Sequence, residues 1–205
     1  MKLTWAVLGL SLAFGLFAKS AMASDNELYY AAEKPFLSNA KWEVRLAGGY
    51  DFSNPYLNVY SGTVGAFYLI DRSLSPGIEV SGFSSSKRGS AQELEDKFSQ
   101  YNIKINAIAP QYSAAAVFRL TPISGVVNFF SSTTLMADIH ILARAGIIQY
   151  ETVDIGPMFG TGLELQMEMS SHWGFAAAIL WDIEKPGGQS WQTRTGFRVG
   201  PSLRF

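Results

Sequence analysis

The chain ends in Arg198-Val199-Gly200-Pro201-Ser202-Leu203-Arg204-Phe205, a stretch in which apolar and polar positions alternate. The odd positions from Val199 to Phe205 are apolar, and the even positions from Arg198 to Arg204 are polar or glycine. Because successive side chains of a β-strand point to opposite faces, this stretch predicts a strand with one apolar and one polar face. Such a strand can close a barrel in lipid or end a soluble domain.

The same residues resemble the terminal recognition signal of Gram-negative outer-membrane barrels. In that signal a polar residue is followed two positions later by glycine, and the third-from-last and last residues are apolar. Arg198, Gly200, Leu203 and Phe205 occupy these positions. The resemblance implies that Gly200, Leu203 and Phe205 form an assembly signal, which the barrel-assembly machinery reads during insertion.

The N-terminal residues have the pattern of an export signal. Met1-Lys2 provides a positive start, residues 5–18 are almost wholly apolar, and Ala21-Met22-Ala23 fits the small-x-small cleavage pattern. The apolar stretch is shorter than the roughly 20 residues that a membrane-spanning helix needs. Residues 1–23 are therefore predicted to be a signal peptide, and residues 24–40, which lack periodicity, a periplasmic N-terminal tail.

Composition excludes several classes of protein. The chain contains no cysteine, so it has no disulfide framework, thiolate metal site or lipidated N-terminal cysteine. Without the signal peptide the formal charge is about −3, and nothing suggests nucleic-acid binding. No metal, nucleotide or organic cofactor is predicted, because the chain has neither a glycine-rich phosphate loop nor a ligand cluster of suitable spacing.

Residues 41–205 contain eight segments in which apolar and polar residues alternate. Most of them reach the roughly 9 to 11 residues that a tilted strand needs to cross a bilayer, and an even number returns both ends to the same side. The sequence therefore predicts an all-β fold, an eight-stranded antiparallel transmembrane up-and-down β-barrel over residues 41–205. The expected strands are 41–52, 58–70, a short one around 78–81, 112–120, 133–149, 154–169, 173–183 and 191–205.

The predicted connections differ in length. The longest one on the outer side covers residues 84–111, and Ser90 followed by Glu93 predicts a capping box that opens a short helix there. On the periplasmic side, the run Thr121-Pro122-Ile123-Ser124-Gly125 is predicted to end the fourth strand. Both ends of the barrel are expected in the periplasm.

Aromatic residues at the strand ends distinguish a membrane barrel from a soluble one, since a soluble barrel needs its large apolar side chains inside. Tryptophan and tyrosine are favoured where lipid meets water. Two girdles are predicted, with mostly smaller apolar residues between them. They comprise Trp42, Tyr68, Phe118, Trp173 and Phe205 at the periplasmic ends, and Tyr50, Tyr60, Tyr112, Trp181 and Trp191 at the outer ends.

The opposite parity of the strands carries charges that are too costly to present to hydrocarbon. A barrel of eight strands has an interior just wide enough for side chains, so these charges are expected to pair across it. Arg45 and Arg198 are expected at similar depth, with Glu79 and Glu164 as their carboxylate partners. The predicted lumen charge network is Arg45, Glu79, His140, Arg144, Glu164, Arg194 and Arg198.

An enzyme is the second class of function to consider, because some small outer-membrane barrels modify lipid A with histidine, serine and an acidic residue. His140 is the only histidine predicted to point inward, and no serine lies beside it on the same strand. The sequence therefore predicts no catalytic residues and no enzyme activity.

In architecture, residues 41–205 resemble the small eight-stranded outer-membrane barrels of the OmpA and OmpX type. The run from Gly48 to Tyr60 (GGYDFSNPYLNVY) and the run Ser84-Ser85-Ser86-Lys87-Arg88 resemble an outer-membrane β-barrel domain family of predatory and gliding bacteria. This resemblance implies a fold and a location in the cell outer membrane. It implies no activity and transfers no catalytic residue.

The sequence thus predicts an integral outer-membrane barrel with a structural or envelope role. It would contact outer-membrane lipid and lipopolysaccharide. Two alternatives remain open at this point: a narrow ion or solute channel through the lumen, and a surface receptor or adhesin that acts through residues 84–111. The sequence names no surface ligand.

Overall fold

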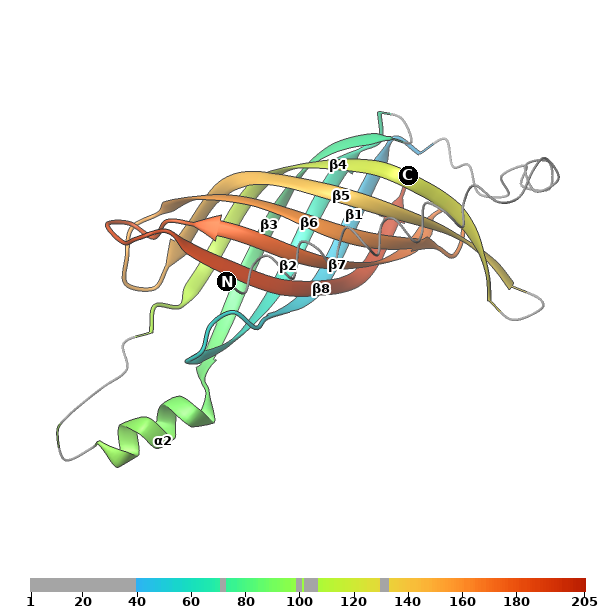
Figure 1. Ribbon diagram of the computed structural model, residues 1–205. Coiled ribbons are helices and arrows are strands. Elements are labelled where there is room, and N and C mark those ends of the chain that lie inside the picture. Colours follow the sequence, from blue (N-terminus) through green and yellow to red (C-terminus); the bar gives the residue numbers. More distant parts are fainter. Residues whose placement is uncertain (1–39, 71–72, 99–100, 102–106, 130–132) are drawn as a thin grey trace, which may run out of the picture. The chain divides into compact units, whose positions relative to one another are not determined.

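The computed structural model describes residues 40–70, 73–98, 101, 107–129 and 133–205. The predicted signal peptide and residues 24–39 of the predicted tail lie outside the described residues. The described part contains eight strands and one helix (Figure 1). These are β1 (Trp42–Asp51), β2 (Leu57–Tyr68), β3 (Leu74–Lys87), α2 (Gly89–Lys97), β4 (Pro110–Phe129), β5 (Thr133–Tyr150), β6 (Gly156–Glu168), β7 (Trp173–Glu184) and β8 (Gln192–Arg204).

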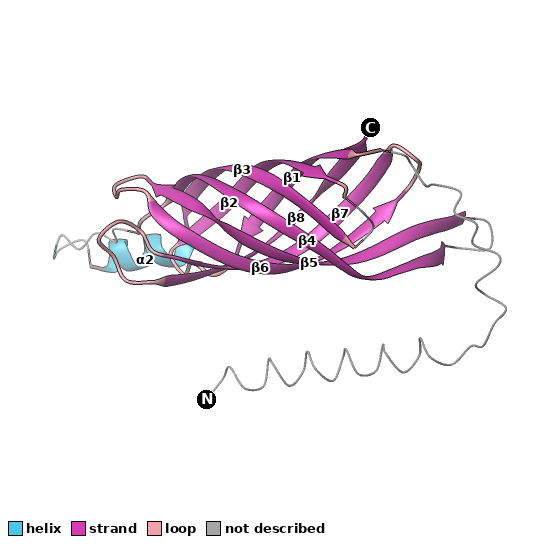
Figure 2. Ribbon diagram, turned by 90° about the horizontal axis from the view of Figure 1, so that it is seen from above, coloured by secondary structure: helices cyan, strands magenta, loops and turns pink. Residues whose placement is uncertain are grey.

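The strands form a closed barrel in which each pairs antiparallel with the next and β8 pairs with β1 (Figure 2). The predicted eight-stranded antiparallel up-and-down barrel is confirmed. Trp42 and Phe205 exchange backbone hydrogen bonds of 3.1 and 3.0 Å, so β1 begins where β8 ends. We call this the turn end, and the opposite end, where β3 and β4 are joined through α2, the loop end. No helix among the described residues is long and apolar enough to cross a membrane.

The alternation of residue types determines which face of each strand is buried. In β1, Glu43 and Arg45 are buried inside the barrel, whereas Leu46, in the middle of the same strand, is exposed on the outside. In β6, Glu164 and Gln166 are buried, and Leu165 is exposed. Charged side chains therefore fill the interior and apolar ones cover the exterior, the reverse of a soluble barrel.

The fourth strand is longer than predicted. Thr121-Pro122 does not end it: β4 continues to Phe129, and its register with β5 shifts between Leu120 and Ile123. Proline is tolerated at such a bulge, because the ladder hydrogen bonds are interrupted there. Pairing resumes at Ile123↔Ile139, so β4 and β5 extend together toward residues 130–132, which lie outside the described residues.

The predicted helix exists, but its predicted cap is wrong. Helix α2 begins at Gly89, with the extended residue Arg88 at the N-cap and no side-chain cap hydrogen bond. Arg88 is anchored to the barrel wall, because its Nε donates to the Leu57 carbonyl oxygen (3.1 Å) and its Nη2 to the Tyr50 hydroxyl (3.2 Å). This anchoring places the start of the helix one residue before Ser90.

At the seam where β8 pairs with β1, the backbones approach so closely at Gly200 that no side chain would fit there. Gly49 pairs with Arg198 and Arg45 with Ser202, and Gly200 lies between these pairs. A Cβ atom on Gly200 would collide with the Leu46 carbonyl oxygen and would lie 2.7 Å from the Cα of Ala47. Close backbone approach of this kind requires glycine, so Gly200 has a packing role besides its predicted part in the assembly signal.

We expect Gly200→Val to prevent closure of the barrel, whereas Gly48→Val should be tolerated. Gly48 is the matched control, because it lies on the outer face of the same seam and a Cβ there meets nothing within 4 Å. Refolding the purified variants in detergent, without assembly machinery, isolates the packing effect. The measurement is the heat-modifiable gel shift of the folded barrel. A Gly200→Val protein that folds as well as Gly48→Val would contradict the packing role.

Candidate functional site: the charged barrel interior

The structure buries every residue of the predicted lumen network. It also buries further charged and amide side chains that the predicted network did not contain, although they share the same strand parity. Counting every charged or amide residue of inward parity would have found them. They are Glu43, Asp51, Arg119, Asp138, Gln166, Glu168, Asp182 and Glu184.

At the turn end the interactions converge on Glu43, which is fully buried. Its Oε1 accepts hydrogen bonds from Arg119 Nη1 (2.7 Å) and Arg45 Nη2 (2.9 Å). Its Oε2 accepts from Arg204 Nε (2.9 Å) and Gln166 Nε2 (3.0 Å). Charge-assisted hydrogen bonds are the strong class, and a buried carboxylate needs such partners to offset its loss of hydration.

An inward aromatic ring completes this cluster. Phe67 departs from the expected alternation of β2 and is fully buried in the interior. The guanidinium groups of Arg45 and Arg119 lie 4.9 and 4.5 Å from the centre of its ring. Arg45 also donates to Glu164 on the far wall of the barrel. The ring therefore stabilises two buried cations through its face, while Glu43 and Glu164 balance their charge.

His140 is a member of the same network. Its Nε2 lies 3.0 Å from Gln166 Oε1, and its Nδ1 lies 2.8 Å from the Thr121 hydroxyl. Because the Gln166 amide nitrogen donates to Glu43, its oxygen is the acceptor, which assigns the proton to Nε2 of His140. The group that orients the imidazole is thus an amide. The Glu164 Oε1 atom lies farther away, at 3.9 Å.

The loop end holds a second cluster. Arg144 Nη1 lies 2.7 and 2.8 Å from the two carboxylate oxygens of Asp182. Arg194 donates from Nη2 to Asp182 (3.1 Å) and from Nε to Glu184 (3.1 Å), and Tyr150 donates its hydroxyl to Glu184. The Arg194 guanidinium also stacks on Phe83, 4.8 Å from the ring centre.

Glu79 connects the middle of the barrel to the loop-end cluster. Its Oε2 lies 3.2 Å from Arg198 Nη1 and 3.3 Å from Arg144 Nη2. The structure thus pairs Arg198 with Glu79 and Arg45 with Glu164. The expected common depth of Arg45 and Arg198 is wrong, because Arg198 lies opposite Gly49 and Arg45 opposite Ser202. The stagger of tilted strands in a closed barrel causes this offset.

The interior leaves little open space between the two clusters. A cavity of about 20 Å³ is lined by Arg45, Glu79, Glu164 and Arg198 together with small and apolar residues. That volume holds about one water molecule. Above it, at the loop end, a buried apolar cluster of Leu57, Val59 and Ala109 packs with Phe83 and Ala107.

Within the described ranges, no group of three or more histidine, aspartate or glutamate side chains is arranged to hold a metal ion. The carboxylates are instead occupied by arginine, as the ion pairs above show. The chemistry available here is therefore charge pairing and hydrogen bonding.

No protein-family model matches this chain, and no curated protein sequence is similar to it. Among solved structures, the crystal structure of Neisserial surface protein A (NspA) matches with a TM-score of 0.46 and 10% identity, over 81% of this chain and 98% of that one. A de novo designed transmembrane β-barrel matches with a TM-score of 0.38 and 13% identity, over 80% of this chain and 94% of the design. Both similarities are too low to transfer a function.

We expect Glu43→Gln to destabilise the barrel by about 3–5 kcal/mol, because it leaves buried arginines without their shared carboxylate. Glu93→Gln on the exposed face of α2 is the matched control and should have little effect. Urea unfolding of the refolded proteins in lipid vesicles measures the difference. Equal unfolding midpoints for the two variants would show that Glu43 is not the centre of the cluster.

Proposed function

We propose that this protein is an integral outer-membrane β-barrel with a structural or envelope role and an interior filled by paired charges. The observation that carries the proposal is the inverted polarity of the closed barrel. Buried arginines and carboxylates fill its interior, whereas its exterior exposes large apolar side chains on every strand. Water would penalise that exterior over its whole circumference, and only lipid makes it favourable.

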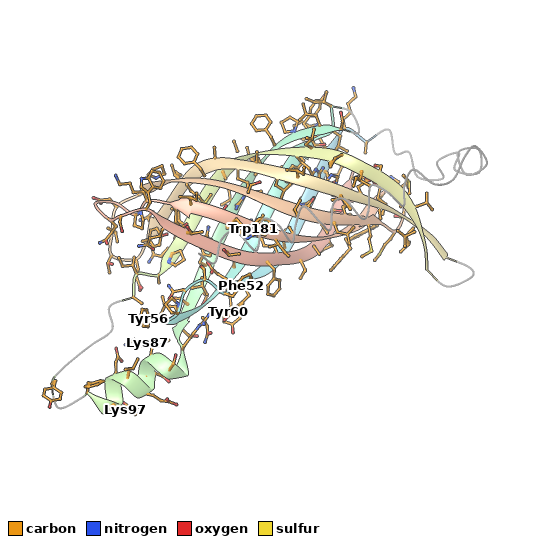
Figure 3. All side chains as sticks on the ribbon, in the orientation of Figure 1. Phe52, Tyr56, Tyr60, Lys87, Lys97 and Trp181 are labelled. Atoms are coloured by element: carbon orange, nitrogen blue, oxygen red, sulfur yellow. The ribbon has the colours of Figure 1, made fainter. Side chains whose placement is uncertain are left out.

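Aromatic pairs at both ends support a bilayer around the barrel. At the turn end, Trp42 and Tyr68 have ring centres 5.1 Å apart, and at the loop end Tyr50 and Tyr60 lie 5.3 Å apart. Such rings are favoured at the two membrane interfaces. Figure 3 shows Tyr60 among the outward side chains near the loop end. The proposed orientation places the turn end in the periplasm and the loop end outside.

The closed interior favours a structural role over an open pore. The cavity between Arg45, Glu79, Glu164 and Arg198 holds about one water molecule. Opening it would separate buried ion pairs, and leaving a buried charge unpaired is costly.

The proposed partners follow from this location. Lipid would cover the apolar belt, and lipopolysaccharide would meet the aromatic rim, where Tyr56 and Tyr60 are exposed. Residues 1–23 would direct export, and the terminal residues Leu203 and Phe205, both exposed on the outer face, would be available to the assembly machinery.

The membrane location predicts a large cost for an outward charge. We expect Val80→Arg, in the middle of β3 on the exposed face, to destabilise the barrel by about 2–4 kcal/mol in a bilayer. Val80→Ala is the control for lost packing. Folding into lipid vesicles, followed by denaturant titration, measures the cost. A Val80→Arg protein that is as stable as Val80→Ala would contradict a lipid-facing β3.

A narrow channel is the second candidate, and its path would have to pass the small cavity between the two charge clusters. Single-channel recording of the refolded protein in a planar bilayer tests it. The structural proposal predicts a silent bilayer for a well-folded barrel. Stable conductance steps that change in Glu79→Gln or Arg198→Gln would instead assign a channel controlled by these residues.

A receptor or adhesin role for residues 84–111 is supported by exposed apolar side chains. The described part of this connection exposes apolar side chains at Leu94, Phe98 and Tyr101. Exposed apolar groups on a long connection are typical of contact surfaces. This role is compatible with a closed interior.

A further inference from the structure

A second cavity, of about 120 Å³, lies at the loop end of the barrel. It is formed where β1, β5 and β7 end and β4 and β8 begin, together with the β1–β2 connection. The polar residues that line it include Asp51, Asn54, Tyr150, Glu184, Gln192 and Arg194. Binding sites often lie on connections that a rigid scaffold positions.

Short-range hydrogen bonds fix the shape of this cavity. Asp51 Oδ1 accepts from the backbone nitrogen (2.9 Å) and hydroxyl (2.6 Å) of Ser53. Asn54 Oδ1 accepts from the backbone nitrogens of Tyr56 (2.9 Å) and Leu57 (3.0 Å). The β1–β2 connection is therefore held by its own side chains, and Asp51 is kept at the cavity wall.

Two charged side chains of this wall each have one polar atom that forms no hydrogen bond with a described residue. Asp51 Oδ2 accepts no hydrogen bond from any described residue, and its ionic partner, Arg194 Nε, lies 3.7 Å away. Arg194 uses Nε for Glu184 and Nη2 for Asp182, and its Nη1 donates to no described residue. The side chains of Asp51 and Arg194 are only 8% and 9% exposed, but these two atoms are not among the fully enclosed polar atoms that lack a hydrogen bond, so water or a ligand in the cavity can bond to them.

The pairing of a free acceptor with a free donor selects the chemistry of that ligand. An anion would be repelled by the carboxylates of Asp51 and Glu184, and a cation would be repelled by Arg194, which lies within 4 Å of Asp51. A hydroxyl group both donates and accepts, so it can bridge the two side chains. The amide of Gln192 has the same dual capacity, and the Asn54 amide nitrogen is a donor.

We propose that the loop-end cavity binds a neutral sugar through its hydroxyl groups, with Asp51 Oδ2 as acceptor and Arg194 Nη1 as donor. The cavity of about 120 Å³ has room for the hydroxyl-bearing edge of one sugar ring. The sugar could be a free monosaccharide or the terminal residue of a polysaccharide, since both present the same hydroxyl groups. This inference does not depend on whether the barrel interior conducts.

Amide chemical shifts of the full mature protein, refolded in phosphocholine micelles, test the proposal. Detergents with sugar headgroups are avoided because they would compete. The probes are the methyl glycosides of glucose, galactose and mannose, with ethylammonium chloride and sodium acetate as charged comparisons. We expect saturable shifts around Asp51, Tyr150 and Arg194 with at least one glycoside. A polysaccharide fragment ending in the same sugar distinguishes the two sources.

Asp51→Asn is the decisive variant, because it keeps an Oδ1 acceptor for Ser53 and replaces Oδ2 by an amide donor, while it also removes the carboxylate charge beside Arg194. It should weaken glycoside binding by about tenfold or more, since a charge-assisted hydrogen bond is lost. Asp138→Asn, at the turn end where Asp138 bonds Ser124, is the matched control and should bind normally. Both variants must retain the heat-modifiable shift. Saturable shifts with ethylammonium or acetate alone, no shifts with any glycoside, or equal binding by Asp51→Asn would each overturn the proposal.

Discussion

The rest of the structure depends on one constraint: each charge of inward parity must find a partner inside a barrel that has room only for side chains. Glu43 shows how the constraint is met, because it is fully buried and receives hydrogen bonds from Arg45, Arg119, Arg204 and Gln166. These residues come from β1, β4, β6 and β8, so a single carboxylate links strands all round the turn end. An apolar side chain at this position would leave those arginines buried without their shared partner.

The same network specifies the register of the strands. A slip of one residue in β1 would turn Glu43 and Arg45 outward toward the apolar exterior, and a slip of two would move Arg45 away from Glu164. The exterior tolerates such shifts far better, since Val64, Val80 and Ala114 are interchangeable apolar neighbours in one row. Buried ion pairs add little net stability when compared with well-packed apolar residues. Their value here lies in making one register much better than its neighbours.

Alternation along the chain was sufficient to predict the barrel, because a period of two on eight consecutive segments allows few other folds. It could not predict which charges pair, since the depth of Arg198 relative to Arg45 depends on the stagger of the closed sheet. Phe67 interrupts the polar face of its strand, and alternation alone gives no reason for it, but in the structure Arg45 and Arg119 stack on its ring. Pro122 looked like the end of a strand, because a bulge that accommodates proline has no distinct signal in one sequence.

The two ends of the interior differ in how much open space lies beside their charged side chains. At the turn end, both oxygens of Glu43 are occupied by donors. At the loop end, Arg194 is shared among Asp51, Asp182 and Glu184, and Asp51 Oδ2 has only this ionic contact, at 3.7 Å from Arg194 Nε. In the turn-end cluster Arg45 Nε, Arg119 Nε and Glu164 Oε1 lack a hydrogen-bond partner among the described residues, but they are fully buried and have only a cavity of about 20 Å³ beside them, whereas the loop-end cluster borders a cavity of about 120 Å³. The charges at the turn end therefore serve the stability of the barrel, and the proposed binding site lies at the loop end, on the side of the long connection.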